Sequence, residues 1–367
     1  MKTNSLFLDA TRASGSTSSN PKYCAPRLTV RERELDELKA GSIRVEMVQV
    51  GICGTDLHLV KTEKDGKTIE CSAPFSIPSS GRVIGHEGYG KVIEVGSAVT
   101  GIALGDFVTF ESLIACYRCD RCRRGQFNQC RHAKLLGLEE DGLFTLIADV
   151  PASLAHPIND LVGQGNPRAL ACVEPAAVAF LACQNAKVSP AERVAIFGGG
   201  PIGLYCAIAA KTLFGASEIH LVEPVRFRRA LAEEWVDETW TPEDFFASSQ
   251  HDLDVVFESS GHLANLTRSF PRINANGRAV ILGRCGEPLV IEDSDHMITN
   301  AIQIMGSRGH LGGAFDDLLK LYRHGRFPLE APVTETIEGL SQLKHYLERG
   351  VDILERNCKV LVRLNQG

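Results

Sequence analysis

The chain has 367 residues, of which 44% are hydrophobic and 23% charged, a composition typical of a globular protein large enough for two domains. A formal net charge of −6 argues against a nucleic-acid-binding surface and against attachment to an anionic membrane. We see no apolar run close to the roughly 18 residues of a membrane span, and residues 1–20 lack the long apolar core of a signal peptide.

The start of the chain and its cysteines indicate a frayed terminus and a reducing compartment. Residues 1–20 are mainly polar, with residues 6–8 as their apolar patch, and we expect them to fray. The 12 cysteines, in a chain without a secretory signal, are not expected to form disulfides. We therefore expect free thiols and a cytoplasmic location.

The first stretch with chemical potential follows a predicted strand. Residues 27–50 predict two short strands joined by the charged segment Arg31–Lys39, and the second strand runs into a turn at Gly51 and Gly54. Cys and His are ligands that zinc prefers, and the other groups are able to orient ligands or move protons. Four such side chains follow the strand: Cys53, Thr55, Asp56 and His58. A buried cysteine beside an ordinary turn is the alternative.

A second stretch places a histidine next to an acid. Residues 59–82 break the strand pattern and predict a surface excursion, after which His86 and Glu87 stand between Gly85 and Gly88. Neighbouring side chains on an extended strand point to opposite faces. Both therefore reach one metal ion only where the flanking glycines let the chain turn. The alternative is a surface histidine at a glycine-rich strand end.

A cysteine cluster with the spacing C-x2-C-x2-C-x7-C comes next. Four thiolates this close in sequence are able to close a tetrahedral shell around zinc without distant segments, and a closed shell leaves no position for a substrate. We therefore predict a structural zinc lobe at about 111–135. Its ligands would be Cys116, Cys119, Cys122 and Cys130. The interleaved arginines also allow a nucleic-acid zinc knuckle, which the acidic chain disfavours.

The segment Ala169–Cys183 predicts a helix with Glu174 and Pro175 in its first turns, where proline is tolerated. An acid near a helix start is usually there because of the helix dipole. A functional role for Glu174 therefore depends on the residues around it.

The clearest fold signal is a glycine motif between a strand and a helix. Arg193–Phe197 and Glu218–Val222 predict strands, Leu204–Phe214 predicts a helix, and an acid ends the second strand. The motif between them is the G-x-G-x-x-G of dinucleotide-binding units, in which the turn and the helix start hold the diphosphate. We assign cofactor binding to Gly198, Gly200, Pro201, Ile202, Gly203 and Glu223.

Later apolar runs at 254–258, 278–282 and 302–305 alternate with helical or loop segments, which indicates a parallel sheet with crossover helices. Segments 315–322 and 339–349 predict amphipathic helices, and 359–364 predicts a closing strand. The predicted fold class is α/β.

Taken together, the motifs resemble the zinc-containing medium-chain dehydrogenase/reductase family, and within it the polyol, threonine and sugar dehydrogenases. The resemblance covers about residues 27–364 and rests on GICGTDLH at 51–58, GHEGYGKVIEVGSAVTG at 85–101, CYRCDRCRRGQFNQC at 116–130, VEPAAVA at 173–179 and GGGPIGL at 198–204. It implies a Rossmann doubly wound parallel sheet domain at 181–306. It also implies a GroES-like β-rich catalytic domain formed by 1–180 and 307–367.

The resemblance also implies roles for single residues. Cys53 and His86 would bind a catalytic zinc ion, and Glu87, Glu174 or a water molecule would complete its shell, with Glu174 preferred to the nearby Cys172. Thr55 and His58 would form a proton relay, Asp56 would support the ligands, and Arg228 would lie along the adenosine ribose. The segment 61–81 is longer than is common in the family, so it could reshape the mouth of the substrate site.

The implied activity is a zinc-dependent hydride transfer between NAD and a secondary alcohol of a polyol, sugar, cyclitol or amino alcohol. Zinc favours the alkoxide form of an alcohol oxygen, which then gives up hydride. Glu223 would bind a ribose diol and repel a 2′-phosphate, which favours NAD, although Arg226 and Arg228 leave NADP open. We expect two zinc ions per chain, a small-molecule alcohol or ketone as partner, and a homodimer or homotetramer.

Two other functions fit parts of the pattern. An NADP-dependent carbonyl reductase would use the same scaffold, and its cofactor preference would distinguish it. A non-catalytic nucleotide-binding protein would keep the fold with one zinc ion, at the four cysteines, in place of two.

Overall fold

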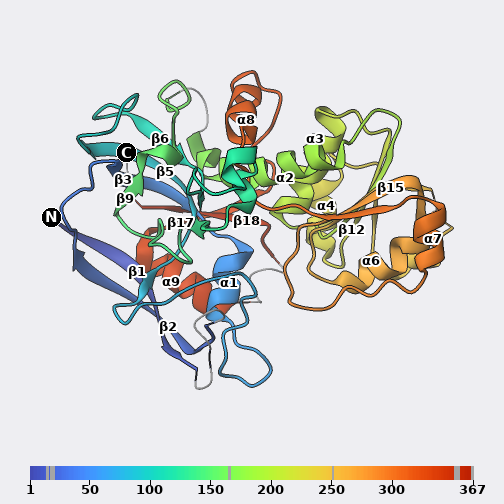
Figure 1. The fold of residues 1–367 in the computed structure, drawn as a ribbon, viewed down its shortest axis with the longest axis horizontal. Helices are drawn as coiled ribbons and strands as arrows, with labels where there is room; N and C mark the ends of the chain where they lie inside the picture. Colours follow the sequence, from blue (N-terminus) through green and yellow to red (C-terminus); the bar gives the residue numbers. More distant parts are fainter. Residues whose placement is uncertain (14–15, 17–20, 164–166, 250–251, 351–355, 365–367) are drawn as a thin grey trace.

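The computed structural model describes residues 1–13, 16, 21–163, 167–249, 252–350 and 356–364. Figure 1 shows two lobes side by side: a β-rich lobe that contains β1 and β3, and a second lobe in which helices flank the sheet containing β12 and β15.

The β-rich lobe is organised around β3 (Ser42–Gly51). This strand pairs antiparallel with β5 (Glu87–Val95), β9 (Ile147–Pro151) and β18 (Lys359–Arg363). The seven-stranded sheet has the path β10-β6-β5-β3-β18-β17, and its remaining members are β6 (Phe107–Phe110), β10 (Ala155–Pro157) and β17 (Val333–Glu338). The last strands of the chain therefore complete a sheet begun near its start.

Residues 2–12 form a strand, so the predicted fraying is wrong for this part of the N-terminus, while residues 14–15 and 17–20 lie outside the described residues. β1 (Lys2–Arg12) pairs with β2 (Tyr23–Glu34) and with β4 (Arg82–Val83). Leu6 and Leu8 are fully buried, because alternate side chains of a strand share a face. β2 also runs through residues 31–34, which were predicted to lie in a charged connection. Its charged side chains alternate between the two faces of a small sheet: Arg31 and Arg33 are half-buried, and Glu32 and Glu34 are exposed.

The predicted surface excursion at 59–82 contributes to the core. The short helix α1 (Gly54–Val60) begins directly after Cys53, where a turn was predicted. The segment buries four apolar side chains, Leu59 within this helix and Ile69, Phe75 and Ile77 beyond it.

The second lobe contains the predicted doubly wound parallel sheet. Its six strands lie in the order β13-β12-β11-β14-β15-β16. They are β11 (Arg193–Phe197), β12 (Glu218–Val222), β13 (Glu238–Trp240), β14 (Leu253–Glu258), β15 (Ile273–Ile281) and β16 (Gln303–Gly306). The order reverses between β11 and β14, where open sheets of this kind bind ligands. The helices are α3 (Pro201–Thr212), α4 (Arg226–Ala232), α5 (Pro242–Ala247), α6 (Leu263–Ser269) and α7 (Ser294–Thr299).

Three further helices belong to the described part of the chain. α2 (Val173–Ala186) packs against α3 and α8 (Ala314–Arg323), and α9 (Gly339–Arg349) packs against β2 and β17. By length and composition, Ala169–Ala186 would suffice for a membrane span, contrary to the sequence expectation, but 78% of this segment is buried inside the protein.

A small lobe projects from the β-rich part. It contains the short strands β7 (Leu113–Ile114) and β8 (Lys134–Leu135), with 3-10 turns at Cys122–Arg124 and Phe127–Gln129 between them. Other 3-10 turns lie at Ala152–Leu154, Pro167–Cys172 and Phe270–Arg272.

Candidate active site and structural metal lobe

Strand pairing gathers the candidate ligands at the end of β3. Gly51, the last residue of this strand, pairs with Glu87 of β5 on one side and with Leu361 of β18 on the other. A Cβ atom at Gly51 would collide with the Glu87 carboxylate. Cys53 follows at the start of α1. Residues far apart in sequence therefore meet around a glycine that leaves room for them.

Cys53, His86 and Glu87 form a compact group. One ligand atom of each lies within 4.8 Å of the others. His86 and Glu87 are buried and Cys53 is half-buried. Glu87 Oε1 has no hydrogen-bond partner among the described residues, and a buried oxygen without a partner is costly. A thiol, an imidazole and a carboxylate are zinc ligands, so the group fits a zinc ion that would satisfy this oxygen.

Asp56 supports two of these residues from behind. Its Oδ2 accepts the backbone N–H of Cys53 at 2.9 Å, and its Oδ1 lies 3.6 Å from His86 Nδ1. Asp56 is fully buried, and burial raises the pKa of its carboxyl group. An acid in this position orients a ligating imidazole, which is the role predicted for Asp56.

The buried charges around the group favour a bound cation. Three buried acids lie here, facing the buried ammonium group of Lys359: Asp56, Glu87 and Glu174. Burial opposes a charged imidazole, yet the negative charges of Cys53 and Asp56 raise the pKa of His86 well above its usual value. Uncompensated buried charge is costly. A divalent cation would offset this excess of negative groups.

Glu174 lies beside the three-residue group on α2. Its Oε1 accepts the Ser112 hydroxyl at 2.6 Å and lies 3.9 Å from His310 Nδ1. The Ser112 N–H donates to His310 Nε2 at 2.9 Å, so a neutral ring carries its proton on Nδ1, toward Glu174. Burial raises the pKa of Glu174 to about 7 and lowers that of His310 to about 3. The Ser112 hydroxyl thus holds Glu174 in place, and His310 lies beside it.

A pocket opens beside the group, between the two lobes. Thr55, His58 and residues 70–73 line one side, and Arg284 and Cys285 line the other. Residues 70–73 of the long 61–81 segment therefore line this pocket.

The proposed relay residues lie along this pocket. Thr55 Oγ1 is 3.8 Å from Cys53 Sγ, at the inner end. His58 is half-exposed, and its Nδ1 lies 3.2 Å from Glu70 Oε1. The structure thus places Thr55 near the candidate ligands and His58 nearer to solvent.

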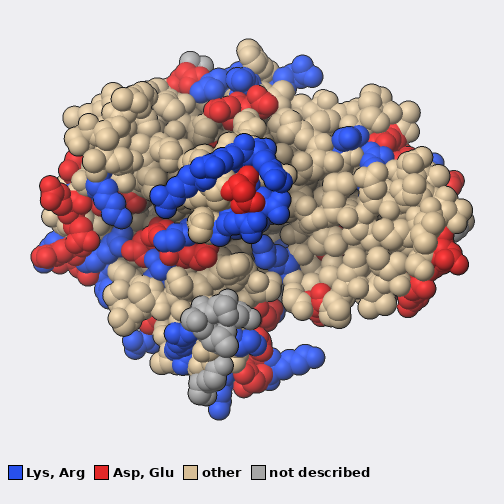
Figure 2. Space-filling view, in the orientation of Figure 1, with Lys and Arg blue, Asp and Glu red and all other residues tan. Residues whose placement is uncertain are grey.

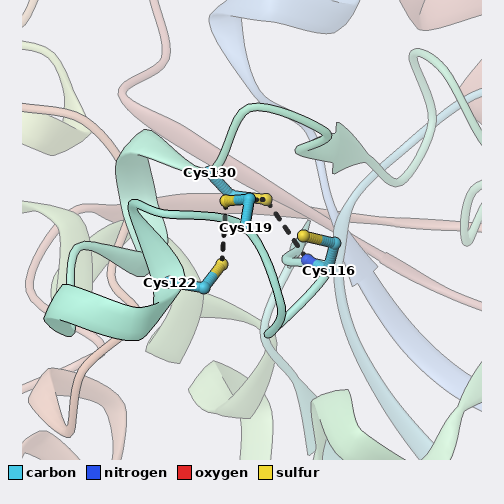
Figure 3. A group of neighbouring side chains, drawn as sticks. All are labelled: Cys116, Cys119, Cys122 and Cys130. Carbon is cyan, nitrogen blue, oxygen red and sulfur yellow. Dashed lines mark hydrogen bonds between the residues drawn. The ribbon is translucent and has the colours of Figure 1, made fainter.

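The four clustered cysteines converge in the small lobe (Figure 3). Cys119 Sγ lies 3.6 Å from Cys122 Sγ and 3.9 Å from Cys130 Sγ. Tetrahedral zinc with four sulfur ligands at about 2.3 Å requires sulfur–sulfur distances of about 3.8 Å. The N–H of Cys116 donates to Cys130 Sγ at 3.2 Å. Backbone N–H groups of Cys122 and Arg131 lower the pKa of Cys119 to about 6. The lobe therefore fits a structural zinc ion.

The glycine motif connects β11 to α3, with Gly200 directly before the helix and Pro201 as its first residue. A Cβ atom at Gly203 would lie 1.9 Å from the Gly198 carbonyl oxygen, so only glycine allows this packing. Nothing lies within 4 Å of a Cβ placed at Gly200. Ile202 is half-buried in the first turn. The helix start is open to an approaching diphosphate.

Glu223 ends β12 and shapes the same turn. Its Oε2 accepts the Gly199 N–H at 2.6 Å and its Oε1 accepts the Val225 N–H at 2.9 Å. Each carboxylate oxygen keeps a second lone pair for a ribose hydroxyl. Arg228 lies next to Gly199, and its Nη2 donates to the Asn357 carbonyl at 3.1 Å.

Several residues of the site were missed from the sequence. Ser112 holds Glu174, and His310 lies beside it. Lys359 contacts Glu87, and Glu70 contacts His58. The sequence contains one indication that Lys359 is unusual, because it is a charged residue at the start of the apolar run 359–364. The others lie in irregular segments whose local pattern gives no indication of a partner.

Comparisons with known proteins agree with this geometry. The family described as the alcohol dehydrogenase GroES-like domain matches residues 39–160. The chain is 29% identical over 322 residues to an L-threonine 3-dehydrogenase of Pyrococcus abyssi, covering 84% of this chain and 87% of that protein. It is 38% identical over 208 residues to an L-idonate 5-dehydrogenase of Vitis vinifera, covering 56% and 54%.

Solved structures share the whole fold. An alcohol dehydrogenase of Escherichia coli CFT073 in complex with NADH superposes with a TM-score of 0.83 at 22% identity, covering 99% of both chains. A protein of Sinorhizobium meliloti 1021, described as a zinc-binding dehydrogenase and bound to NADP, gives a TM-score of 0.79 at 26% identity, covering 98% and 99%. The predicted fold class, a Rossmann sheet domain with a GroES-like domain, is confirmed.

Proposed function

Because the chain belongs to the zinc-containing medium-chain dehydrogenase/reductase family, we propose that it oxidises a secondary alcohol of a polyol, sugar, cyclitol or amino alcohol with NAD, using one catalytic and one structural zinc ion. The observation that carries this proposal is the buried group of Cys53, His86 and Glu87 beside the pocket between the lobes. The domain limits 1–180 with 307–367, and 181–306, stay a prediction.

Cys53 and His86 would hold the catalytic zinc ion. Asp56 orients them through the Cys53 N–H and the His86 ring. Glu87 would join the shell through its unpaired Oε1, while Lys359 restrains the other oxygen. Glu174 would face the metal directly or through water.

When bound, zinc acts as a Lewis acid that favours loss of the alcohol proton, and the nicotinamide accepts the hydride. Thr55, 3.8 Å from Cys53 Sγ, would take up that proton as the inner end of the relay. His58 would pass it to solvent, and the carboxylate of Glu70, 3.2 Å from its Nδ1, stabilises the charged imidazole.

NAD is proposed over NADP. Glu223 would share its carboxylate with a ribose diol and would repel a 2′-phosphate. Its burial at 4% exposure supports this role, because a phosphate there would meet an acid shielded from solvent. A preference for NADP would favour the alternative, a carbonyl reductase on the same scaffold.

We also propose a cytoplasmic homodimer or homotetramer. All 12 cysteines are free thiols, as expected in a reducing compartment. β16 is an edge strand of the parallel sheet, and the large apolar side chains of Ile298 and Val290 nearby are exposed, which supports association there. Light scattering in solution tests the oligomeric state.

The decisive experiment compares Cys53→Ser with Cys24→Ser, a half-buried cysteine outside the site. We expect metal analysis to give two zinc ions per wild-type chain and one in Cys53→Ser. Turnover of an alcohol panel, followed as NADH absorbance, should be lost in Cys53→Ser, while NAD binding stays. Full activity of Cys53→Ser would refute the proposal, and Cys24→Ser should resemble the wild type.

A further inference from the structure

A glycine-rich segment connects the two lobes next to the candidate active site. This linking segment, residues 307–313, runs from the end of β16 to the start of α8. Three of its glycines have positive φ angles: Gly309 (74°), Gly312 (100°) and Gly313 (98°). Glycine loses more conformational freedom on folding than any other residue, so the linking segment favours no single conformation by itself. Contacts from other parts of the molecule must fix it.

Asn128 of the small lobe fixes the linking segment. Its Nδ2 donates to the Leu311 carbonyl and its Oδ1 accepts the Leu311 N–H, both at 3.0 Å. Asn128 and Leu311 are both buried. A side-chain amide is able to donate to a carbonyl and to accept from an N–H at the same time, whereas a carboxylate lacks the donor and an apolar side chain lacks both. The contact therefore depends on the asparagine side chain.

The packing around Asn128 is close. A Cβ atom at Gly309 would lie 2.4 Å from Asn128 Oδ1 and 3.3 Å from Leu113 Cδ2, so glycine is needed there. Leu311 belongs to the apolar core of the small lobe, together with Leu113, Ala115, Cys122 and Cys130. The small lobe therefore holds the linking segment by two hydrogen bonds and by the burial of one leucine.

His310 lies in the linking segment and reaches the candidate active site. It is fully buried, and its Nε2 accepts the Ser112 N–H at 2.9 Å. The Ser112 hydroxyl donates to Glu174 Oε1 at 2.6 Å, and His310 Nδ1 lies 3.9 Å from the same oxygen. One serine next to β7 of the small lobe is therefore bonded both to His310 and to Glu174.

The imidazole of His310 stays in this position at a cost. Because Nε2 accepts the Ser112 N–H, the proton of the neutral ring lies on Nδ1. Nδ1 has no hydrogen-bond partner among the described residues, and a buried donor without a partner is unfavourable. A ring released from the linking segment would therefore move toward water, and the Ser112 N–H would lose its acceptor.

The small lobe also has exposed residues that do not take part in this contact. Arg118, Arg123 and Arg124 are exposed, and on the face drawn in Figure 2 Lys and Arg side chains gather near the junction of the two lobes. Gln126 is exposed as well, and its Oε1 accepts from Arg121 Nη1 at 3.3 Å. Replacing Gln126 should leave the linking segment in place, which makes it a matched control for Asn128.

We propose that Asn128 is a positioning residue for the active site. By holding the linking segment against the small lobe, it keeps His310 on Ser112 and thereby keeps Ser112 on Glu174. The small lobe thus fixes a carboxylate of the catalytic site in addition to folding around its own metal. This inference rests on the proposed function, because it takes Glu174 as the group that faces the catalytic zinc ion.

Amide hydrogen exchange of the holoenzyme tests whether Asn128 holds the linking segment. Asn128→Ala should speed exchange at residues 309–313 by about tenfold or more, the effect of losing hydrogen bonds of ordinary strength, and should leave exchange in β14 unchanged. Leu311→Ala removes the buried leucine of the same contact and should have the same effect, so the test stands even where Asn128→Ala folds poorly. Unchanged exchange at 309–313 in both variants would overturn the inference.

Cobalt(II) in place of zinc tests whether the effect reaches Glu174, because the visible absorption of cobalt depends on the kind and arrangement of its ligands. The absorption of the four-cysteine site is measured in Cys53→Ser and subtracted. We expect Asn128→Ala to change the remaining absorption, which comes from the catalytic site, and Gln126→Ala to leave it unchanged. Faster exchange at 309–313 with an unchanged catalytic-site absorption would mean that Asn128 only stabilises the fold, and the inference would be wrong.

Steady-state kinetics give the consequence for turnover. With an alcohol that the wild type oxidises, Asn128→Ala should lower kcat/KM by about tenfold, and Gln126→Ala should match the wild type. An unchanged kcat/KM in Asn128→Ala, or an equal loss in Gln126→Ala, would overturn the positioning role. Absence of oxidation across the whole alcohol panel would instead refute the proposed activity, and hydrogen exchange and cobalt absorption would still decide the role of Asn128.

Discussion

The ammonium group of Lys359 contacts the carboxylate of Glu87, and both side chains are buried. Lys359 also donates to the Ile52 carbonyl at 2.8 Å. The two residues lie on β18 and β5, the strands that flank β3 at its active-site end. The pair therefore joins the last strand of the chain to the candidate zinc ligands. Replacing either residue should change the charge balance of the site.

Lys359→Met should destabilise the metal-free protein by about 3–5 kcal/mol, because it leaves a buried carboxylate without its counterion. Added zinc should reduce this loss, since a divalent cation at Glu87 would replace the missing charge. Urea unfolding with and without zinc measures both effects. Adding Glu87→Gln should recover much of the stability of the metal-free variant.

The matched control for that experiment is Lys344→Met. Lys344 pairs with Glu348 at 2.8 Å on the surface of α9, and such pairs contribute less than about 1 kcal/mol. A loss in Lys359→Met that zinc does not reduce would contradict the charge balance inferred for the site.

The two zinc sites should respond differently to cysteine substitution. Cys119→Ser and Cys53→Ser should each lower the zinc content from two ions to one. Only Cys119→Ser should lower the melting temperature strongly, because its lobe has a small core that is itself built around the four cysteines. Metal analysis and calorimetric unfolding of the same preparations check this. Equal melting temperatures of the two variants would count against a structural role for the lobe.

Cofactor selectivity should depend on Glu223. Glu223→Gln removes the negative charge but keeps one carbonyl acceptor for the N–H groups of Gly199 and Val225. We expect kcat/KM with NAD to fall about tenfold and that with NADP to rise, because the repulsion of a 2′-phosphate is lost. The ratio of the two values is the measurement, with Glu233→Gln on the exposed end of α4 as control. An unchanged ratio would remove Glu223 from the ribose site.

The N-terminal strand should make stability sensitive to acid. Hydrogen bonds from Arg31 lower the pKa of Asp9 below its usual 3.8, through contacts of 2.7 and 2.9 Å. A lowered folded-state pKa gives stability that is present above the unfolded pKa and is lost as the pH falls through the folded value. Asp9→Asn should therefore be less stable than the wild type at pH 7, and the difference should shrink below about pH 4.

Urea midpoints measured from pH 7 down to pH 3 follow this difference. Glu32→Gln is the control, because Glu32 forms an exposed pair with Lys2 on the same two strands. A difference between Asp9→Asn and the wild type that does not depend on pH would contradict the stabilising ion pair with Arg31.

The sequence was most informative where all the residues that form a structural feature lie within one short segment. The cysteine spacing at 116–130 predicts its own shell, because the ligands need no distant partner. The strand–glycine–helix pattern at 193–223 predicts the cofactor turn, since Gly203 packs against Gly198 within the same unit. Predictions failed where the structure of a segment depends on a second segment that its own sequence does not indicate. Residues 2–12 looked polar, yet β2 supplies the neighbour that makes them a strand.

By itself, the sequence determined the fold class, the four-cysteine cluster and the glycine motif, because each follows from residue types at fixed local spacing. The candidate ligands of the catalytic zinc, Cys53 and His86, followed from the family resemblance of the segments around them. Only the tertiary structure decided which side chains support them. Ser112 with Glu174, Lys359 with Glu87, and Arg284 opposite Thr55 come from segments 62, 272 and more than 200 residues apart. Their pairing depends on burial and charge, and these arise only once strands from both ends of the chain lie against β3 and the two lobes enclose the pocket.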